Sequence, residues 1–181
     1  MPESLGNIVN LEELFIYDNK IEKLPQSISK LKNLKRMIIS DNLLSDLPDG
    51  FNELDSLESL DMGDNKFTSF PNEVLDLSNL VILDISGDSI STLPLDFDKL
   101  TKLWSLKASR CGLASLPESI GNLKKLQVLI LINNPLSSLP ESIKNLKDNL
   151  QDIYLIETNF SESEKKKLQE WLPKTRIFWS Y

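Results

Sequence analysis

The side chains that most often carry out catalysis are scarce in this chain of 181 residues. It contains no histidine, which excludes histidine-based acid–base catalysis, Ser-His-Asp triads and histidine-ligated zinc within the chain. Its single cysteine, Cys111, allows no internal disulfide and no cysteine metal cage. No phosphate-binding glycine loop, nucleophile elbow or zinc-protease motif occurs. The sequence therefore predicts a protein that is not an enzyme and that needs no cofactor.

Carboxylates are the remaining groups whose spacing suggests chemistry. Asp18, Asp41 and Asp64 recur every 23 residues, and on adjacent strands their side chains would lie within about 5 Å of one another. Because calcium takes clustered oxygen ligands, these three form the candidate metal site, with solvated charge as the alternative. Asp61 and Asp84 form a similar pair, but an open surface offers no burial to shift either pKa for acid–base catalysis.

The composition limits the class of partner. The chain has 27 acidic and 20 basic residues, a net charge of -7, which argues against nucleic acid as a partner. A hydrophobic content of 40% is typical of a packed protein. No apolar run is long enough to span a bilayer, and no signal peptide is visible. With no disulfide to form, a cytoplasmic location is favoured, or secretion if a precursor segment was removed.

Leucine and proline spacing gives the organisation of the chain. Leucine accounts for 34 residues, and seven of the nine prolines recur at intervals of 23 residues: Pro2, Pro25, Pro48, Pro71, Pro94, Pro117 and Pro140. A fixed period of this length indicates a solenoid of stacked repeats. Aligned on it, seven repeats begin at Leu11, Leu34, Leu57, Leu80, Leu103, Leu126 and Leu150, with one residue inserted at 147–149.

The first full repeat reads Leu11-x-x-Leu14-x-Ile16-x-x-Asn19-x-Ile21-x-x-Leu24-Pro25-x-x-Ile28-x-x-Leu31. This frame resembles the leucine-rich repeat family in its 23-residue LPxxIxxL variety, and the resemblance covers residues 2–160. The variety occurs in plant intracellular Ras-group-related repeat proteins, in Ras-pathway scaffolds and in many bacterial proteins, including those of Leptospira. The resemblance implies an adaptor, a receptor or a bacterial host-interaction protein that binds a protein or peptide.

The frame also has a direct physical interpretation. Alternating apolar residues favour a short strand with one buried face, and the asparagine can satisfy backbone groups in the turn that follows. Leu-Pro then starts a 3₁₀-like return segment. Because one repeat cannot bury its own core, neighbours must stack. The predicted fold is α/β: a right-handed leucine-rich-repeat solenoid, or horseshoe, with a parallel β-sheet on the concave face, a 3₁₀ or irregular convex side and a C-terminal helical cap.

The two ends of the array differ. Residues 1–10 form a partial, uncapped N-terminal repeat, so we expect either that the array continues before it or that a partner covers Leu5 and Ile8. Self-association through this end is a further alternative. Residues 11–160 contain the seven repeats. In 161–181, Ser161 and Glu164 form a capping box for a helix, and a terminal strand follows it.

Function is expected at the strand positions between the inward leucines, which form columns on the concave face. The candidate partner-binding residues are Phe15, Tyr17, Ile38, Ile82, Trp104, Lys107, Arg110, Val128, Ile130, Ile132, Tyr154 and Ile156. The last five form an apolar patch on neighbouring strands, as expected of a protein-binding surface, although β-branched residues also simply suit strands. Lys107 and Arg110 either pair with acidic groups of a partner or are solvated. Trp104 either contacts a partner or covers a neighbouring side chain.

The column of asparagines is interrupted by Asp88, Cys111 and Thr158. An ionised aspartate accepts hydrogen bonds but cannot donate them, and a thiol is a poor donor. Two weak positions in succession predict local distortion or extra mobility at Asp88 and Cys111. We interpret Cys111 as a buried structural cysteine and not as a redox site.

These observations predict a non-catalytic protein-interaction module that binds through its concave face. A regulatory or sensor fragment of a larger enzyme or receptor is the first alternative. A cation-dependent adhesive surface is the second, and it depends on the aspartate column described above.

Overall fold

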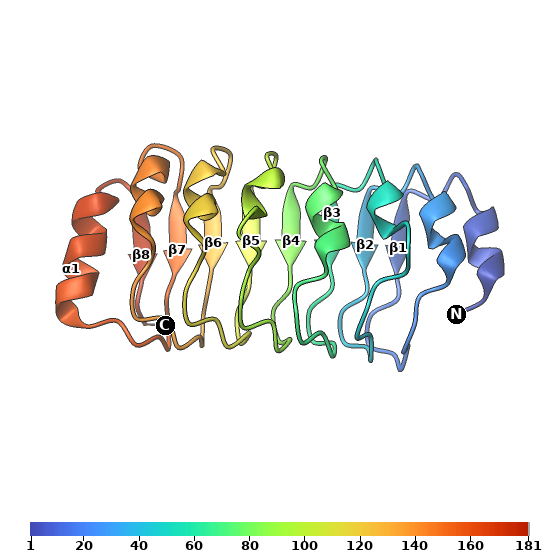
Figure 1. The fold of residues 1–181 in the computed structure, drawn as a ribbon, viewed down its shortest axis with the longest axis horizontal. Helices are drawn as coiled ribbons and strands as arrows, with labels where there is room; N and C mark the ends of the chain where they lie inside the picture. Colours follow the sequence, from blue (N-terminus) through green and yellow to red (C-terminus); the bar gives the residue numbers. More distant parts are fainter. Residues whose placement is uncertain (181) are drawn as a thin grey trace.

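A computed structural model describes residues 1–180. In this part of the chain, eight short parallel strands form one sheet in chain order (Figure 1). The strands are β1 (Glu13–Phe15), β2 (Arg36–Ile38), β3 (Ser59–Asp61), β4 (Ile82–Asp84), β5 (Ser105–Lys107), β6 (Val128–Ile130), β7 (Asp152–Tyr154) and β8 (Arg176–Phe178). Each residue pairs with the equivalent residue of the next repeat, as Leu14 does with Met37. The predicted parallel sheet is confirmed.

Seven 3₁₀-helices form the opposite side of the molecule and lie in front of the sheet in Figure 1. They are η1 (Glu3–Asn7), η2 (Gln26–Lys30), η3 (Phe51–Glu53), η4 (Asn72–Asp76), η5 (Phe97–Lys99), η6 (Glu118–Asn122) and η7 (Glu141–Leu146). Five of them begin directly after a repeat proline, whose fixed φ suits a first-turn position. The predicted 3₁₀ return segments are therefore confirmed.

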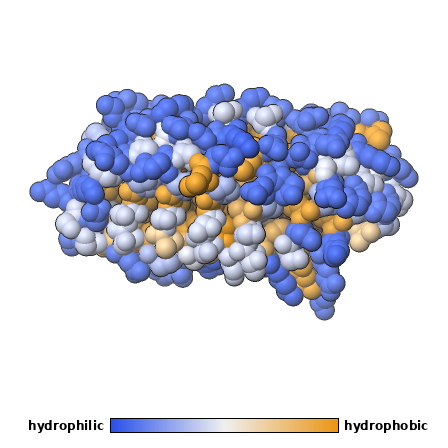
Figure 2. Space-filling model, in the orientation of Figure 1, coloured by the Kyte–Doolittle hydropathy of each residue, from blue (hydrophilic) through white to orange (hydrophobic). Residues whose placement is uncertain are grey.

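The hydrophobic core runs the length of the solenoid between these two layers. From the strands come inward side chains such as Leu60, Leu83 and Leu129, which are fully buried. From the helical side come Phe51 and Phe97, also fully buried. The helical face of the molecule is largely polar at its surface, with apolar atoms visible in bands between the polar side chains (Figure 2). Each repeat thus contributes to one continuous core that it shares with its neighbours.

Buried asparagines join successive repeats through the turns after the strands. Asn42 donates from Nδ2 to the carbonyl oxygens of Ile39 (3.1 Å) and Ile16 (2.9 Å), and its Oδ1 accepts from the backbone N–H of Ile21 (3.0 Å). Asn65 and Asn134 make equivalent bonds. The predicted role of this amide, which needs both donors and an acceptor, is confirmed.

Asp88 occupies the same position but lacks the donors. Its Oδ1 accepts from the backbone N–H groups of Asn65 (3.2 Å) and Phe67 (2.9 Å). Within residues 1–180, Oδ2 is buried without a hydrogen-bond partner. Burial raises the pKa of Asp88 to about 7, against the hydrogen bonds from Phe67 and Asn65. Protonation would supply the missing donor, so this carboxyl group favours its neutral form.

Cys111 is also buried, and its Sγ contacts the carbonyl oxygens of Ile85 (3.2 Å) and Ser109 (3.4 Å). Burial raises the pKa of this thiol to about 12, which leaves it protonated. The strands on either side keep the uniform register through β3, β4 and β5. The strand pairing is thus regular on both sides of these two positions, while local distortion or extra mobility at Asp88 and Cys111 stays a prediction.

The C-terminal helix α1 (Glu162–Trp171) lies beyond β8 at the end of the sheet (Figure 1). Ser161 is its N-cap and accepts from the backbone N–H of Glu164 (3.3 Å). Leu168 and Leu172 are buried against the last repeats. The predicted helical cap and its capping serine are confirmed.

At the other end, η1 packs on η2 and lies at the end of the row of 3₁₀-helices. The carboxylate of Glu3 accepts from the backbone N–H groups of Gln26 (3.1 Å) and Ser27 (2.9 Å). Ile8 and Val9 remain exposed beside it. Over residues 1–180, no helix combines the length and hydrophobicity that crossing a bilayer requires.

The inward assignment predicts the cost of truncating a core leucine. Leu129→Ala should lower the free energy of unfolding by about 2–5 kcal/mol, because it leaves a cavity in a site without solvent access. Leu95→Ala is the matched control, since Leu95 is 87% exposed and its truncation should cost less than about 0.5 kcal/mol. Urea denaturation of both variants measures the difference, and equal stabilities would contradict the assignment.

Asp88 predicts a pH dependence of stability. Its folded-state pKa of about 7 lies above the ordinary aspartate pKa of 3.8, so its protonation stabilises the fold. This contribution is complete below about pH 4 and is lost as the pH rises through 7. Asp88→Asn, which restores the amide donors, should therefore raise the free energy of unfolding by on the order of 2 kcal/mol at high pH, with little gain at low pH.

Urea denaturation at several pH values measures this effect, with the exposed Asp49→Asn as the matched control. The control should reproduce the pH dependence of the parent chain. A variant Asp88→Asn that retains the fall in stability around pH 7 would show that this carboxyl group is not its source.

Candidate partner-binding surface

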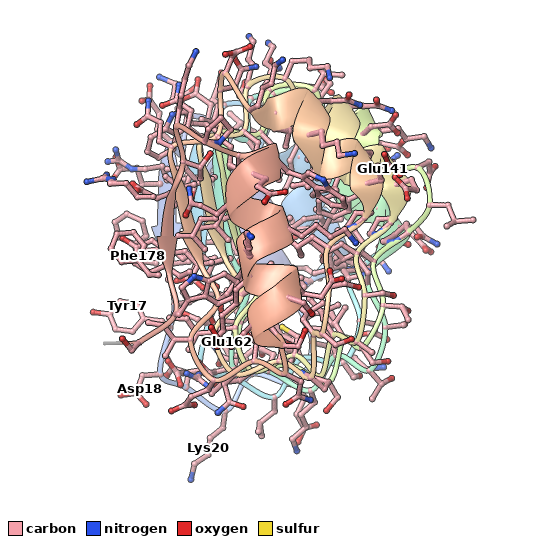
Figure 3. All side chains as sticks on the ribbon, turned by 90° about the vertical axis from the view of Figure 1, so that its left-hand side faces the viewer. Tyr17, Asp18, Lys20, Glu141, Glu162 and Phe178 are labelled. Atoms are coloured by element: carbon pink, nitrogen blue, oxygen red, sulfur yellow. The ribbon has the colours of Figure 1, made fainter. Side chains whose placement is uncertain are left out.

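The open face of the sheet, opposite the 3₁₀-helices, carries the side chains that lie between the inward leucines. In the end-on view of Figure 3, Tyr17 and Phe178 project on this side and Glu141 of η7 lies on the other. Strand pairing aligns equivalent residues in columns. One column runs through Phe15, Ile38, Asp61, Asp84, Lys107, Ile130, Tyr154 and Phe178.

At the C-terminal end of this face lies an apolar patch, here called the C-terminal patch. Val128, Ile130 and Ile132 are half-buried within it. Tyr154 stacks on Phe178 with ring centroids 4.4 Å apart and planes 8° from parallel. Phe178 was missed in the sequence analysis. Ile177 in the terminal strand packs against the core, and because side chains alternate along a strand, its neighbour Phe178 could have been placed on the open face.

Ile156 was predicted to face solvent with this patch, and that prediction is wrong. The residue is only 6% exposed and does not belong to the main core. It lies just after β7, where its carbonyl oxygen accepts from the backbone N–H of Asn133 (2.8 Å) in the preceding repeat.

A second apolar group, here called the N-terminal patch, lies at the other end of the face. Phe15 is 48% exposed and Tyr17 is 57% exposed, and Ile38 lies beside Phe15 by strand pairing. Ile82 is half-buried on β4, and Trp104 is 39% exposed just before β5. The N-terminal patch thus consists of Phe15, Tyr17 and Ile38, while Ile82 and Trp104 lie between it and the C-terminal patch.

The centre of the face is polar, and its cations are paired within the chain. Lys107 Nζ lies 3.4 Å from Asp84 Oδ2. Arg110 Nη2 donates to both carboxylate oxygens of Asp64, at 2.9 and 3.0 Å. These internal pairs are an arrangement that neither sequence-based alternative for Lys107 and Arg110 included. Burial, with Asp84 nearby, raises the pKa of Asp61, so the expectation that this face offers no burial to shift that pKa is wrong.

The aspartate column has a backbone explanation. Asp18, Asp41 and Asp64 adopt positive φ angles of 54°, 53° and 50°, and Arg110 adopts 55° at the same position of its repeat. Short side chains such as aspartate tolerate this left-handed conformation better than most others. Within residues 1–180, no cluster of three or more potential ligands forms a metal site. The candidate metal site at these aspartates is therefore wrong.

Comparisons with known proteins agree with this architecture. A family model described as a leucine-rich repeat region matches residues 60–174, and one described as a leucine rich repeat matches residues 9–67. A search of curated proteins found no match.

Solved structures are similar over most of this chain. A leucine-rich repeat protein of Leptospira interrogans is 30% identical, covers 98% of this chain and 57% of its own, and has a TM-score of 0.60. The ectodomain of the Arabidopsis thaliana receptor kinase GASSHO1/SCHENGEN3, in complex with CASPARIAN STRIP INTEGRITY FACTOR 2, is 28% identical over 88% of this chain and 20% of its own (TM-score 0.76). The plant peptide hormone receptor RGFR1, in complex with RGF2, is 28% identical over 98% of this chain and 29% of its own, with a TM-score of 0.80.

The chain thus spans between 20% and 57% of the length of these three structures. The first family model alone matches more than half of the chain. The matched residues include strands β4 to β7, which pair in one uniform register. This chain belongs to the leucine-rich repeat family.

Proposed function

We propose that the chain is a non-catalytic module that binds a partner protein or peptide through the open, concave face of its sheet. The observation that carries this proposal is the pair of apolar patches on that face. Phe15 and Tyr17 are about half exposed, and Tyr154 stacks on Phe178 at the other end. Exposed aromatic side chains of this kind are typical anchors of protein interfaces.

The rigidity of the face supports the same function. Every strand is hydrogen-bonded to its neighbours in one register, so the side chains of both patches are held at fixed separations. A partner that contacts both patches would lose little free energy in ordering this surface. The paired charges between the patches would set which partner fits.

The structural relatives support a peptide or protein as the ligand. Two of the plant receptor structures described above are complexes, one with CASPARIAN STRIP INTEGRITY FACTOR 2 and one with RGF2. We carry over to this chain only the class of ligand.

A regulatory or sensor fragment of a larger protein is the second candidate. It is favoured by one observation, that the similar structures are longer than this chain and that it spans at most 57% of their length. The open face would then be the partner-binding surface of that larger protein.

Substitutions on the open face test the proposal with peptides selected against the parent chain from a random library. The double variant Ile130→Ser with Tyr154→Ser should weaken the selected peptides by about thirtyfold, because both anchors of the C-terminal patch are lost. Phe15→Ser with Tyr17→Ser tests the N-terminal patch in the same way. Calorimetric titration measures affinity, and circular dichroism melts check that each variant folds.

Leu95→Ser is the matched control, because Leu95 is an exposed leucine outside the sheet. It should leave peptide affinity unchanged. Selected peptides that bind both double variants as tightly as the parent chain would refute binding through the open face.

A further inference from the structure

A groove of about 470 Å³ runs along the edge of the sheet where the strands begin. Its floor is a row of four residues, each in the position before a strand: Val81, Trp104, Gln127 and Gln151. Backbone hydrogen bonds of 2.8–2.9 Å join each member of the row to the next. The groove is thus built on the same rigid ladder as the open face.

Three of the four backbone carbonyl groups of this floor already accept two hydrogen bonds each. The carbonyl oxygen of Trp104 accepts from the N–H groups of both Gln127 (2.9 Å) and Val128 (3.1 Å), and those of Val81 and Gln127 are doubly bonded in the same way. A ligand therefore cannot add to the sheet here through the carbonyls of these three residues. Side chains must provide the recognition.

Trp104 is the apolar contact of the groove. Its side chain is 39% exposed, so a large aromatic surface remains in contact with water. The ring can stack on an aromatic or large apolar side chain while its N–H donates to a carboxylate or carbonyl oxygen.

Three exposed lysines line the same groove: Lys102, Lys124 and Lys125. Lys102 donates to the side-chain oxygen of Asn79, and Lys124 donates to the backbone carbonyl of Gly121 (2.7 Å). In the described part of the chain, none of the three has a carboxylate within 4.0 Å. Their positive charges are therefore not paired within the described part of a chain whose net charge is -7.

The one carboxylate in the lining does not cancel that charge. Asp148 Oδ1 lies 2.8 Å from Lys174 Nζ, which neutralises it. By contrast, the basic residues near the start of β2 are paired, with Lys35 Nζ 2.9 Å from Glu12 and Arg36 against Glu13. Three lysines without a carboxylate partner thus line the same groove as Trp104.

We propose that this groove binds a short acidic peptide segment that carries one aromatic or large apolar side chain, which stacks on Trp104 while carboxylates contact the lysines. The inference deepens the proposed function, on which it rests, by naming the chemistry of the partner. Three strand spacings along the floor amount to about 14 Å, the length of about four extended residues. Charge complementarity selects the acidic residues of this segment.

A single-stranded nucleic acid would also combine negative charge with stacking bases. It fits this edge less well, because the cations of the adjoining groove, which shares Val81, are already paired: Lys35 with Glu12 and Arg36 with Glu13. A longer polyanion would find no unpaired cation in that groove, which also contains Glu58. A short acidic segment confined to the groove beside Trp104 does not need one there.

Fluorescence anisotropy with labelled synthetic probes tests this inference at low ionic strength. The capped pentapeptide Asp-Glu-Phe-Glu-Asp should bind the parent chain about tenfold more tightly than Asn-Gln-Phe-Gln-Asn or Asp-Glu-Ala-Glu-Asp, and more tightly than a five-nucleotide oligothymidylate. Trp104→Ala should weaken the pentapeptide by about tenfold. Lys102→Gln with Lys125→Gln should weaken it by about fivefold and reduce its salt dependence.

Lys20→Gln with Lys166→Gln is the matched control, since both lysines are exposed and lie outside the groove. It should leave the affinity of the pentapeptide unchanged. The lysine variants keep the inference testable if Trp104→Ala does not fold. Equal binding of the acidic and neutral probes, tighter binding of the oligonucleotide, or no loss on removing the lysines would each overturn the inference.

The two proposals fail separately. If the pentapeptide is insensitive to Trp104 and the lysines while library-selected peptides still require Ile130 and Tyr154, the groove inference is wrong and the proposed function stands. If the selected peptides do not require the open face, the proposed function is wrong.

Discussion

The structure depends on the burial of each repeat against its neighbours in one unbroken register. A strand of three residues and a 3₁₀ turn cannot enclose a core, and only the adjacent repeats exclude water from leucines such as Leu60 and Leu83. The turn asparagines reinforce the same contact, because the amide of Asn42 bonds the carbonyl of Ile16 one repeat away. Any residue that disturbs one repeat therefore acts on the pair of repeats beside it.

This constraint also shapes the surface. Because equivalent residues lie side by side, a type of side chain repeated every 23 residues becomes a column, and a change of type becomes a boundary between surface regions. The aspartates at 18, 41 and 64 form a column for a backbone reason, the positive φ angle of that position. Apolar residues at Phe15 and Tyr154, by contrast, have no such backbone requirement, and their exposure makes them candidates for binding.

Charge is distributed unevenly over this framework. Many of the cations on the open face are paired with carboxylates of the chain, as Arg110 is with Asp64. Such pairs lower the net attraction of the central face for an ionic partner and leave its two apolar ends as the contrasting features. The lysines that line the groove beside Trp104 differ, because Lys102 and Lys124 donate to neutral oxygens, so this strand edge offers unpaired cations in a protein whose net charge is -7.

The sequence by itself determined which residues lie inside and which lie outside the sheet, the 3₁₀ returns and the capping helix, because these follow from alternation within a strand and from the 23-residue period. It also indicated which side chains, Phe15, Tyr17 and Trp104 among them, would remain exposed. Only the tertiary structure decided which surface side chains are buried or contacted by other side chains. Ile156 is buried, Tyr154 stacks on Phe178, and Arg110 reaches Asp64 across 46 residues of sequence. These outcomes depend on how far long side chains extend between strands and on the additional strand at the end of the array, neither of which a repeating pattern encodes.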